Sequence, residues 1–144
     1  MKKVHICIFC IIALLVLSCN NSESSHNNCH PYQPNAIEGK WNLVEAITGF
    51  SSFITNYPVG KITWNFNTSN NSVTIINNNT DPNTYDVLET GTYNYSIVNN
   101  PSNPEYCNQS ITIDTYNLGC LTISNNTLTM STIEVDGVLV KLIR

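Results

Sequence analysis

Apolar and polar residues alternate with a period of two along most of the chain, and this pattern restricts the fold more than any other feature. Trp41 and Leu43 are separated by the polar Asn42, and the stretch ITWNFN at residues 62–67 alternates in the same way. Successive side chains of a β-strand point to opposite faces, so such alternation is typical of strands with one buried face and one solvated face. We therefore expect an all-β domain.

Eight segments of this kind are separated by clusters of Asn, Gly, Pro and Asp, which favour turns. No segment has the 3.6-residue period of an amphipathic helix, although residues 48–56 are compatible with a short helical turn. The predicted strands span residues 37–46, 60–67, 72–77, 87–98, 109–114, 119–124, 126–132 and 137–144.

Two architectures suit eight short strands with short links. An antiparallel up-and-down barrel closes the sheet on itself and leaves no free edge. A β-sandwich stacks two open sheets instead. Alternation alone does not distinguish these architectures, so the choice between them depends on a motif in the first strand.

The first 18 residues have the organisation of an export signal. Lys2 and Lys3 precede an apolar run from Ile6 to Leu17. A positive start followed by a short apolar run is typical of a secretory signal peptide, and this run is shorter than the ~20 residues of a membrane-spanning helix. We expect this segment to direct export and to be removed.

The apolar run ends in Val16-Leu17-Ser18-Cys19, which resembles the lipobox of bacterial lipoproteins. The resemblance implies cleavage before Cys19, acylation of the Cys19 thiol by palmitate or a similar chain, and attachment to a membrane of the bacterial cell envelope. In the same family, a residue such as Asn20 after the cysteine favours the outer membrane, on either its periplasmic or its surface face. The alternative is an ordinary secretory signal with an incidental cysteine.

The segment that follows, NNSESSHNNCHPYQPNA at residues 20–36, contains almost no apolar side chain. Such a composition cannot form a core and is typical of a flexible linker. We therefore divide the chain into a signal peptide at residues 1–18, a tether at residues 19–36 and a β-domain at residues 37–144. The β-domain is long enough for one hydrophobic core.

Charge and histidine content argue against several functions. Ten acidic residues outnumber six basic ones, and the formal net charge is −4. A chain without a basic patch is not expected to bind nucleic acid. His5 lies in the signal peptide, and His26 and His30 lie in the tether, so no predicted strand carries a histidine base or metal ligand. We expect no metal, no cofactor and no enzymatic activity.

The first strand begins with Gly39-Lys40-Trp41, which resembles the G-x-W signature of lipocalins. Residues 37–144 as a whole resemble the small lipocalin-like lipoproteins of Bacteroidetes. This resemblance implies an eight-stranded up-and-down barrel and thus favours the barrel over the sandwich. It also implies that Trp41 packs across the closed base of the barrel, in a cation–π contact with Arg144 at the end of the last strand.

The resemblance further implies a site for a small lipophilic ligand in the barrel mouth, opposite the base. The long link after the first strand lies at the mouth, where its aromatic residues form either a lid or a cap on the core. Two carboxylates on inward positions near the rim suggest acid/base chemistry, but we expect them to be solvated. The candidate pocket residues are Leu43, Glu45, Phe50, Phe53, Tyr57, Trp64, Phe66, Glu89, Tyr93, Tyr95 and Val140.

An eight-stranded barrel either holds one small ligand or is filled by its own side chains. A filled barrel would act through its loops, as a non-enzymatic interaction or accessory module of the envelope with unidentified protein partners. Four inward aromatic residues, Trp41, Trp64, Tyr93 and Tyr95, favour a filled base in which only the mouth half is open.

Lipidation of Cys19 leaves Cys29, Cys107 and Cys120 in the exported chain. Strand alternation places Cys107 at the base and Cys120 at the mouth, which are about 15–20 Å apart across a short strand. A disulfide requires Cα atoms within about 7 Å. Since Cys29 precedes the first strand at the base, we predict a Cys29–Cys107 disulfide and an unpaired Cys120.

Overall fold

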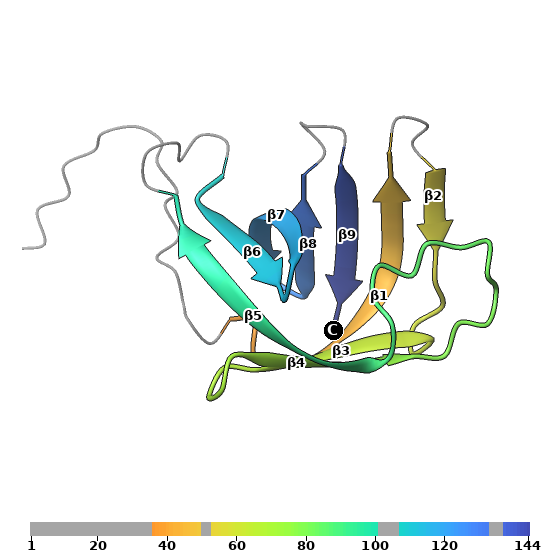
Figure 1. Ribbon diagram of the computed structural model, residues 1–144, viewed down its shortest axis with the longest axis horizontal. Coiled ribbons are helices and arrows are strands. Elements are labelled where there is room, and N and C mark those ends of the chain that lie inside the picture. The colour runs from red at the N-terminus through yellow and green to blue at the C-terminus, as the bar shows by residue number, and fades with distance from the viewer. Residues whose placement is uncertain (1–35, 50–52, 101–106, 133–136) are drawn as a thin grey trace, which may run out of the picture. The chain divides into compact units, whose positions relative to one another are not determined.

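The computed structural model describes residues 36–49, 53–100, 107–132 and 137–144 (Figure 1). The signal peptide, the lipidation site Cys19 and almost the whole tether, Cys29 included, lie outside these ranges. The described chain has no helix that is long and apolar enough to cross a membrane. Its strands are β1 (Gly39–Thr48), β2 (Phe53–Asn56), β3 (Ile62–Asn67), β4 (Ser72–Asn77), β5 (Gly91–Asn99), β6 (Gln109–Ile113), β7 (Tyr116–Ser124), β8 (Thr127–Ser131) and β9 (Val138–Ile143).

Eight of these strands form a closed antiparallel up-and-down barrel, which confirms the predicted fold class. From β3 to β9 each strand pairs with the next one in sequence, and β9 returns to pair with β1. In Figure 1, β6 to β9 and β1 stand side by side, while β3 and β4 run across the lower end of this wall. The sheet closes on itself, so the sandwich alternative does not apply.

The ninth strand, β2, takes up residues 53–56 of the segment 48–56 that was compatible with a short helical turn. It makes an antiparallel hairpin with the second half of β1, from Glu45↔Asn56 to Thr48↔Phe53. The first half of β1 pairs with β3 instead. The sequence FITN is rich in aromatic and β-branched residues, which favour extended structure over helix. Residues 53–56 therefore form a strand and not a helical turn.

Two β-bulges change which residues face the interior. In β1 the register with β9 shifts between Leu43 and Glu45, and Leu43 and Ala46 are both fully buried although they are three positions apart. In β7 a second shift places Leu118 and Leu121 together in the core. A bulge inserts one extra residue, which reverses the alternation of the residues after it.

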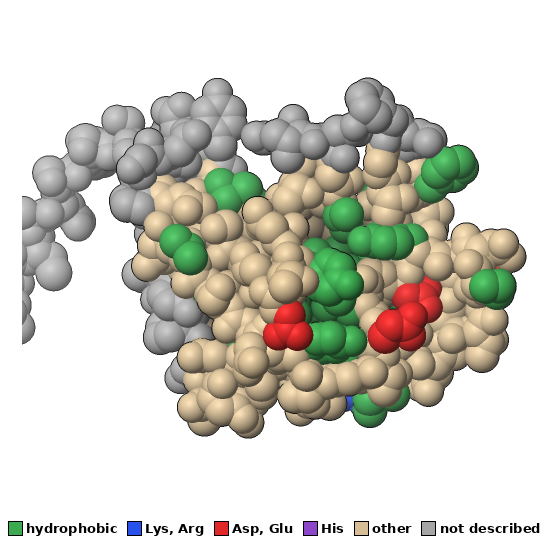
Figure 2. All heavy atoms as spheres, in the orientation of Figure 1, with side chains coloured by type: hydrophobic (Ala, Val, Ile, Leu, Met, Phe, Trp, Pro, Cys, Tyr) green, Lys and Arg blue, Asp and Glu red, His purple; other side chains and the backbone are tan. Residues whose placement is uncertain are grey.

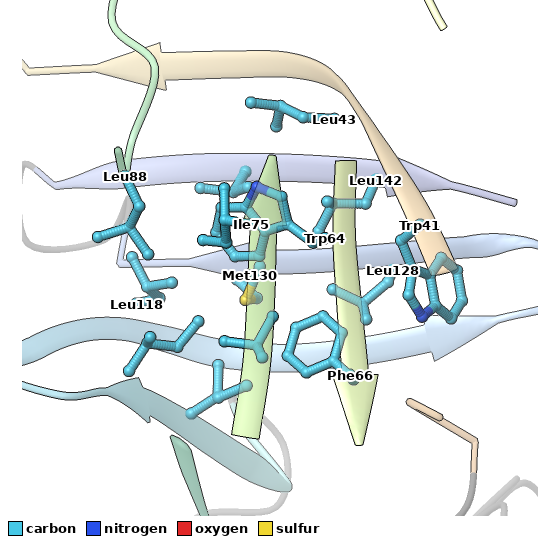
Figure 3. Packing of buried hydrophobic residues seen from close by; sticks show 14 of the residues in the cluster. Trp41, Leu43, Trp64, Phe66, Ile75, Leu88, Leu118, Leu128, Met130 and Leu142 are labelled. Carbon is cyan, nitrogen blue, oxygen red and sulfur yellow. The ribbon is translucent and has the colours of Figure 1, made fainter. Parts of the chain in front are cut away.

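The core fills much of the barrel interior (Figure 3). Large side chains from most strands are at most 1% exposed, and burial of each contributes about 1.5–3 kcal/mol. Leu88, from the loop between β4 and β5, joins them at 5% exposure. The largest of the fully buried side chains are Ile37, Trp41, Leu43, Ile62, Trp64, Phe66, Ile75, Ile111, Ile113, Leu128, Met130 and Leu142.

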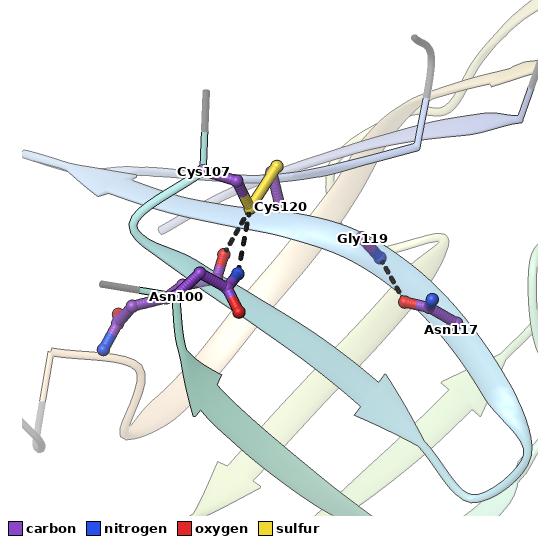
Figure 4. Close-up of a disulfide and its surroundings, with 6 residues drawn as sticks. Asn100, Cys107, Asn117, Gly119 and Cys120 are labelled. Carbon is purple, nitrogen blue, oxygen red and sulfur yellow. Dashed lines mark hydrogen bonds between the residues drawn. A yellow bond between two sulfur atoms is a disulfide. The ribbon is translucent and has the colours of Figure 1, made fainter. Parts of the chain in front are cut away.

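The disulfide joins Cys107 to Cys120, with 5.3 Å between their Cα atoms (Figure 4). The predicted Cys29–Cys107 pairing was wrong, because β7 begins at Tyr116 rather than at residue 119. Cys120 is therefore well inside β7, directly across from Ser110 of β6, and close to the start of that strand. The disulfide thus links the segment just before β6 to the neighbouring strand β7.

Candidate functional site

One end of the barrel, the base, is closed by Trp41 and Arg144. The guanidinium carbon of Arg144 lies 4.3 Å from the centroid of the Trp41 ring. The indole nitrogen of Trp41 donates a hydrogen bond to the carbonyl oxygen of Ile37 at 2.8 Å, and Nη1 of Arg144 donates to the carbonyl oxygen of Glu38 at 3.2 Å. These contacts tie the start of β1 to the end of the chain, in the arrangement that the G-x-W motif suggested.

The turn between β3 and β4 is attached to the same end. The carboxylate of Glu38 accepts a hydrogen bond from the backbone amide of Thr68 at 2.6 Å. Hydrogen bonds from Thr68 hold the pKa of Glu38 below its ordinary value. The base is therefore a fixed end of the barrel, and any opening is to be sought at the other end, the mouth.

The middle of the barrel brings together several of the predicted pocket residues. The rings of Trp64 and Phe66 are 6.2 Å apart, and Phe66 meets Tyr95 edge to face at 5.3 Å. Leu43 and Val140 are fully buried in the same cluster. All five side chains belong to the same core cluster, so they help to fill the interior.

The two predicted rim carboxylates do not line the interior. Glu45 lies across from Lys141, and its neighbour Ala46 lies across from the buried Val140. Since facing residues of an antiparallel pair share a face, the bulge has turned Glu45 to the outside of the barrel. Glu89 is exposed, and its carbonyl oxygen accepts a hydrogen bond from the Tyr93 hydroxyl at 3.1 Å. Tyr93 itself is partly buried against the core.

In the described part of the link after β1, Phe53 does not cover the mouth. Phe53 is 69% exposed on β2, and Phe50 lies outside the described residues. Tyr57, in contrast to Phe53, packs into the core. Its backbone amide donates to the carbonyl oxygen of Val44 at the β1 bulge, which fixes where the link re-enters the barrel.

The loop between β4 and β5, residues 78–90, covers the mouth instead. It places Leu88 in the core. Val87 packs against the core from a left-handed backbone conformation, with φ +70°. Sequence analysis missed this cover because the loop has no apolar period. Its apolar pair, Val87-Leu88, was predicted as the start of the strand at residues 87–98, whereas β5 begins only at Gly91.

A network of polar side chains around Asp86 holds this loop in place. The Tyr57 hydroxyl donates to the carbonyl oxygen of Tyr85 at 2.6 Å and lies 3.1 Å from Oδ1 of Asp86. The side-chain amides of Asn77 and Asn79 donate to the Asp86 carboxylate at 2.8 and 2.7 Å. The loop is thus fastened to the end of β4 and to the link before β3.

The phenol of Tyr57 is sensitive to this environment. Burial, followed by the hydrogen bond and the negative charge of Asp86, raises the pKa of Tyr57 to about 12. Each of these effects disfavours the phenolate relative to the neutral phenol. The network therefore requires Tyr57 in its protonated form.

Figure 2 shows apolar side chains gathered in a narrow hollow on the face that Figure 1 presents. Acidic side chains lie on both sides of its lower end, and almost no Lys or Arg surface is visible on this face. Partly buried apolar residues pack against the core around the interior: Val87, Tyr93, Ile97, Ile123 and Val138.

One buried polar atom lies in this apolar interior without a partner. The indole nitrogen of Trp64 has no hydrogen-bond partner, although Trp64 is 0% exposed. A buried N–H group that loses its bond to water costs about 1–3 kcal/mol. Sequence reasoning placed Trp64 in the interior, but it gave no indication that its nitrogen would be unsatisfied.

The part of the chain that the structure describes contains no group of three or more His, Cys, Asp or Glu side chains arranged to hold a metal ion. Among the described residues, the barrel combines a closed base, a mouth loop held by hydrogen bonds and a buried indole N–H group of Trp64 without a partner. No protein-family model, no curated protein and no solved structure matches the chain.

Proposed function

We propose that this protein is a lipid-anchored, lipocalin-like lipoprotein of the bacterial envelope that binds a small lipophilic ligand in the mouth of its barrel. The observation that carries the proposal is the apolar hollow of Figure 2, which lies above a core that is solid at the base. Ligand pockets are concave and mostly apolar, and the mouths of barrels are common places for them.

The proposed role is binding rather than catalysis. The domain has no histidine, since the three histidines of the chain are at positions 5, 26 and 30. Glu45 and Glu89, the two carboxylates suggested for acid/base work, point away from the interior or into solvent. A binding protein needs only an apolar cavity and a few oriented polar groups, and the apolar hollow of Figure 2 supports the first of these.

The proposed location rests on the residues at the start of the chain. Cleavage before Cys19 would make its acylated thiol the attachment point, and residues 20–36 would separate the barrel from the membrane. One acyl chain binds a membrane only weakly, so a durable anchor requires more than one. We place the anchor in the outer membrane because Asn20 follows the cysteine.

Native mass spectrometry of the protein from its own envelope tests the proposal, after proteolysis in the tether. We expect an extra mass that survives gentle ionisation and is lost on denaturation. Val138→Trp adds bulk at the mouth end of β9, where Val138 is partly buried, and should remove this mass. Val59→Trp adds the same bulk at a 65% exposed position and should retain it. A bare polypeptide mass that no panel of lipids or pigments shifts would contradict the proposal.

A filled barrel that acts through its loops is the second candidate function. It is favoured by the many core side chains that are at most 1% exposed, and by Leu88, which occupies the mouth beneath its loop. In that case the protein is a non-enzymatic interaction or accessory module. The mouth loops and the exposed β2 side chains Phe53 and Ile54 are then where a protein partner is to be sought.

A further inference from the structure

We infer that the ligand is a neutral lipophile with an oxygen acceptor, such as the carbonyl of a ketone or ester, and that this oxygen accepts a hydrogen bond from the indole nitrogen of Trp64. This inference rests on the proposed function and specifies the ligand's chemistry. It starts from the contrast between the two tryptophans of the chain. Both are fully buried, but Trp41 donates to a carbonyl oxygen whereas Trp64 has no partner.

The position of Trp64 suits a ligand that enters from the mouth. Trp64 lies in the middle of β3, between Ile62 toward the mouth and Phe66 toward the base. In Figure 3 its nitrogen points away from Phe66 and Trp41, toward the side where Leu43 and Leu88 lie. A ligand that displaced Leu88 would therefore reach the nitrogen first and would leave the packed base undisturbed.

Water is a poor occupant for this site. Buried waters typically make about three hydrogen bonds to otherwise unsatisfied polar groups. Among the described residues, Thr63 is the only buried polar or charged one, and as the neighbour of Trp64 on β3 it faces the other side of the sheet. A water molecule would find one donor here, whereas an apolar molecule with one oxygen matches both the walls and the donor.

The charges around the barrel indicate that the ligand is neutral. The β-domain has four basic residues. Lys40 and Lys141 are on the outer face of β1 and β9, Lys61 is in the turn before β3, and Arg144 is stacked on Trp41 at the base. The hollow of Figure 2 has acidic side chains beside it. A fatty-acid carboxylate would therefore be buried without a cation, which is costly.

Nuclear magnetic resonance of the full-length protein in detergent tests the inference, because the chain carries its own reporters. The indole N–H signals of Trp41 and Trp64 report hydrogen bonding, and the methyl group of Met130 reports occupancy near Trp64. The probes are 2-undecanone and undecane, which have the same chain length and differ by one oxygen. Dodecanoate serves as the anionic probe.

We expect both undecane and 2-undecanone to shift the Met130 methyl signal. Only 2-undecanone should move the Trp64 indole proton downfield, and the Trp41 signal should stay in place with either probe. If both probes shift Met130 and neither moves Trp64, lipophile binding stands and the hydrogen bond is refuted. If neither shifts Met130, the proposed function fails and the inference fails with it.

A water-filled site has its own signature. The Trp64 indole proton would already be downfield without a ligand, would show a cross-peak to water and would not respond to 2-undecanone. That outcome would overturn the inference. Tighter binding of dodecanoate than of 2-undecanone would overturn the assignment of a neutral ligand.

The variant Trp64→Phe keeps an aromatic ring and removes the donor. Affinity for 2-undecanone should fall about threefold to tenfold, since a single hydrogen bond is worth up to about that factor. Affinity for undecane should be nearly the same in the wild-type protein and in Trp64→Phe. An equal loss for both probes would show that Trp64 contributes only shape, and would refute its role as a donor.

Discussion

Trp41 and Trp64 illustrate how residues of one type acquire different roles from their partners. They face each other across β1 and β3, and both are fully buried. Trp41 has a hydrogen-bond acceptor and a cation over its ring, so all of its binding capacity is used by the protein. Trp64 retains an unused donor. The first arrangement is what a structural residue needs, and the second is what a recognition residue needs.

Truncation of Trp41 measures how much the base contributes to stability. Trp41→Ala removes a fully buried ring and should lower the free energy of unfolding by about 3–5 kcal/mol, as for other large core truncations. Phe53→Ala, at a position that is 69% exposed, is the matched control and should cost no more than about 0.5 kcal/mol. Urea titration measures both, and a loss under 1 kcal/mol for Trp41→Ala would refute the packing role.

Tyr57 makes stability depend on pH in the alkaline range. Its pKa is raised from 10.0 to about 12, so the folded state holds the phenolic proton more tightly than the unfolded state. The resulting stability is fully present below pH 10 and is lost as the pH rises toward 12. The expected loss is about 2–3 kcal/mol.

The variant Tyr57→Phe isolates this effect, since it lacks the titrating group but keeps the ring. Urea titrations at several pH values between 8 and 12 should show a difference between the two proteins that shrinks as the pH rises. A constant difference over that range would mean that Tyr57 titrates normally in the folded state.

At the scale of the element, alternation predicted the strands well and the bulges not at all. The predicted strand at residues 72–77 matches β4, and Trp41 and Leu43 are buried as expected. A bulge adds a single residue and reverses the phase of the period-two pattern, but the few residues of β1 after it, Glu45 to Thr48, are too short a run to display the new phase. For that reason Glu45 was placed inside, and the early start of β7 at Tyr116 made the predicted cysteine pairing wrong.

The β7 bulge requires glycine at position 119. Its φ is +76°, and a Cβ atom would collide with the backbone carbonyl oxygen of Ser131 in β8. Gly119→Ala should therefore cost at least about 2 kcal/mol, from both the left-handed backbone and the collision. Gly49→Ala, at φ +61° with nothing near its Cβ position, should cost about 1 kcal/mol. Equal losses in urea titrations would show that contact with β8 is unimportant.

At the scale of the whole molecule, the two ends of the barrel are built differently. The base is closed by a ring, a cation and the hydrogen bonds of Glu38, all near the two ends of the folded chain. Among the described residues, the mouth is covered by the loop at residues 78–90, which is held by polar side chains and places Leu88 in the core. The sequence revealed the base through a local motif. The mouth cover depends on contacts between distant segments, which no local pattern records.

Substitution of Leu88 tests whether this side chain is a displaceable cover of the ligand site or a permanent part of the core. Leu88→Ala should lower the free energy of unfolding by about 2–3 kcal/mol, because a buried side chain is lost. If the ligand takes the place of Leu88, the same variant should bind 2-undecanone more tightly, since less core packing has to be displaced. Leu128→Ala is the matched control: it removes an equally large side chain at the base, and should lose stability without a gain in affinity. Calorimetric titration measures the affinity for 2-undecanone, and urea titration measures the free energy of unfolding. Weaker binding by Leu88→Ala would mean that Leu88 is a wall of the site, and unchanged binding would mean that the ligand enters elsewhere.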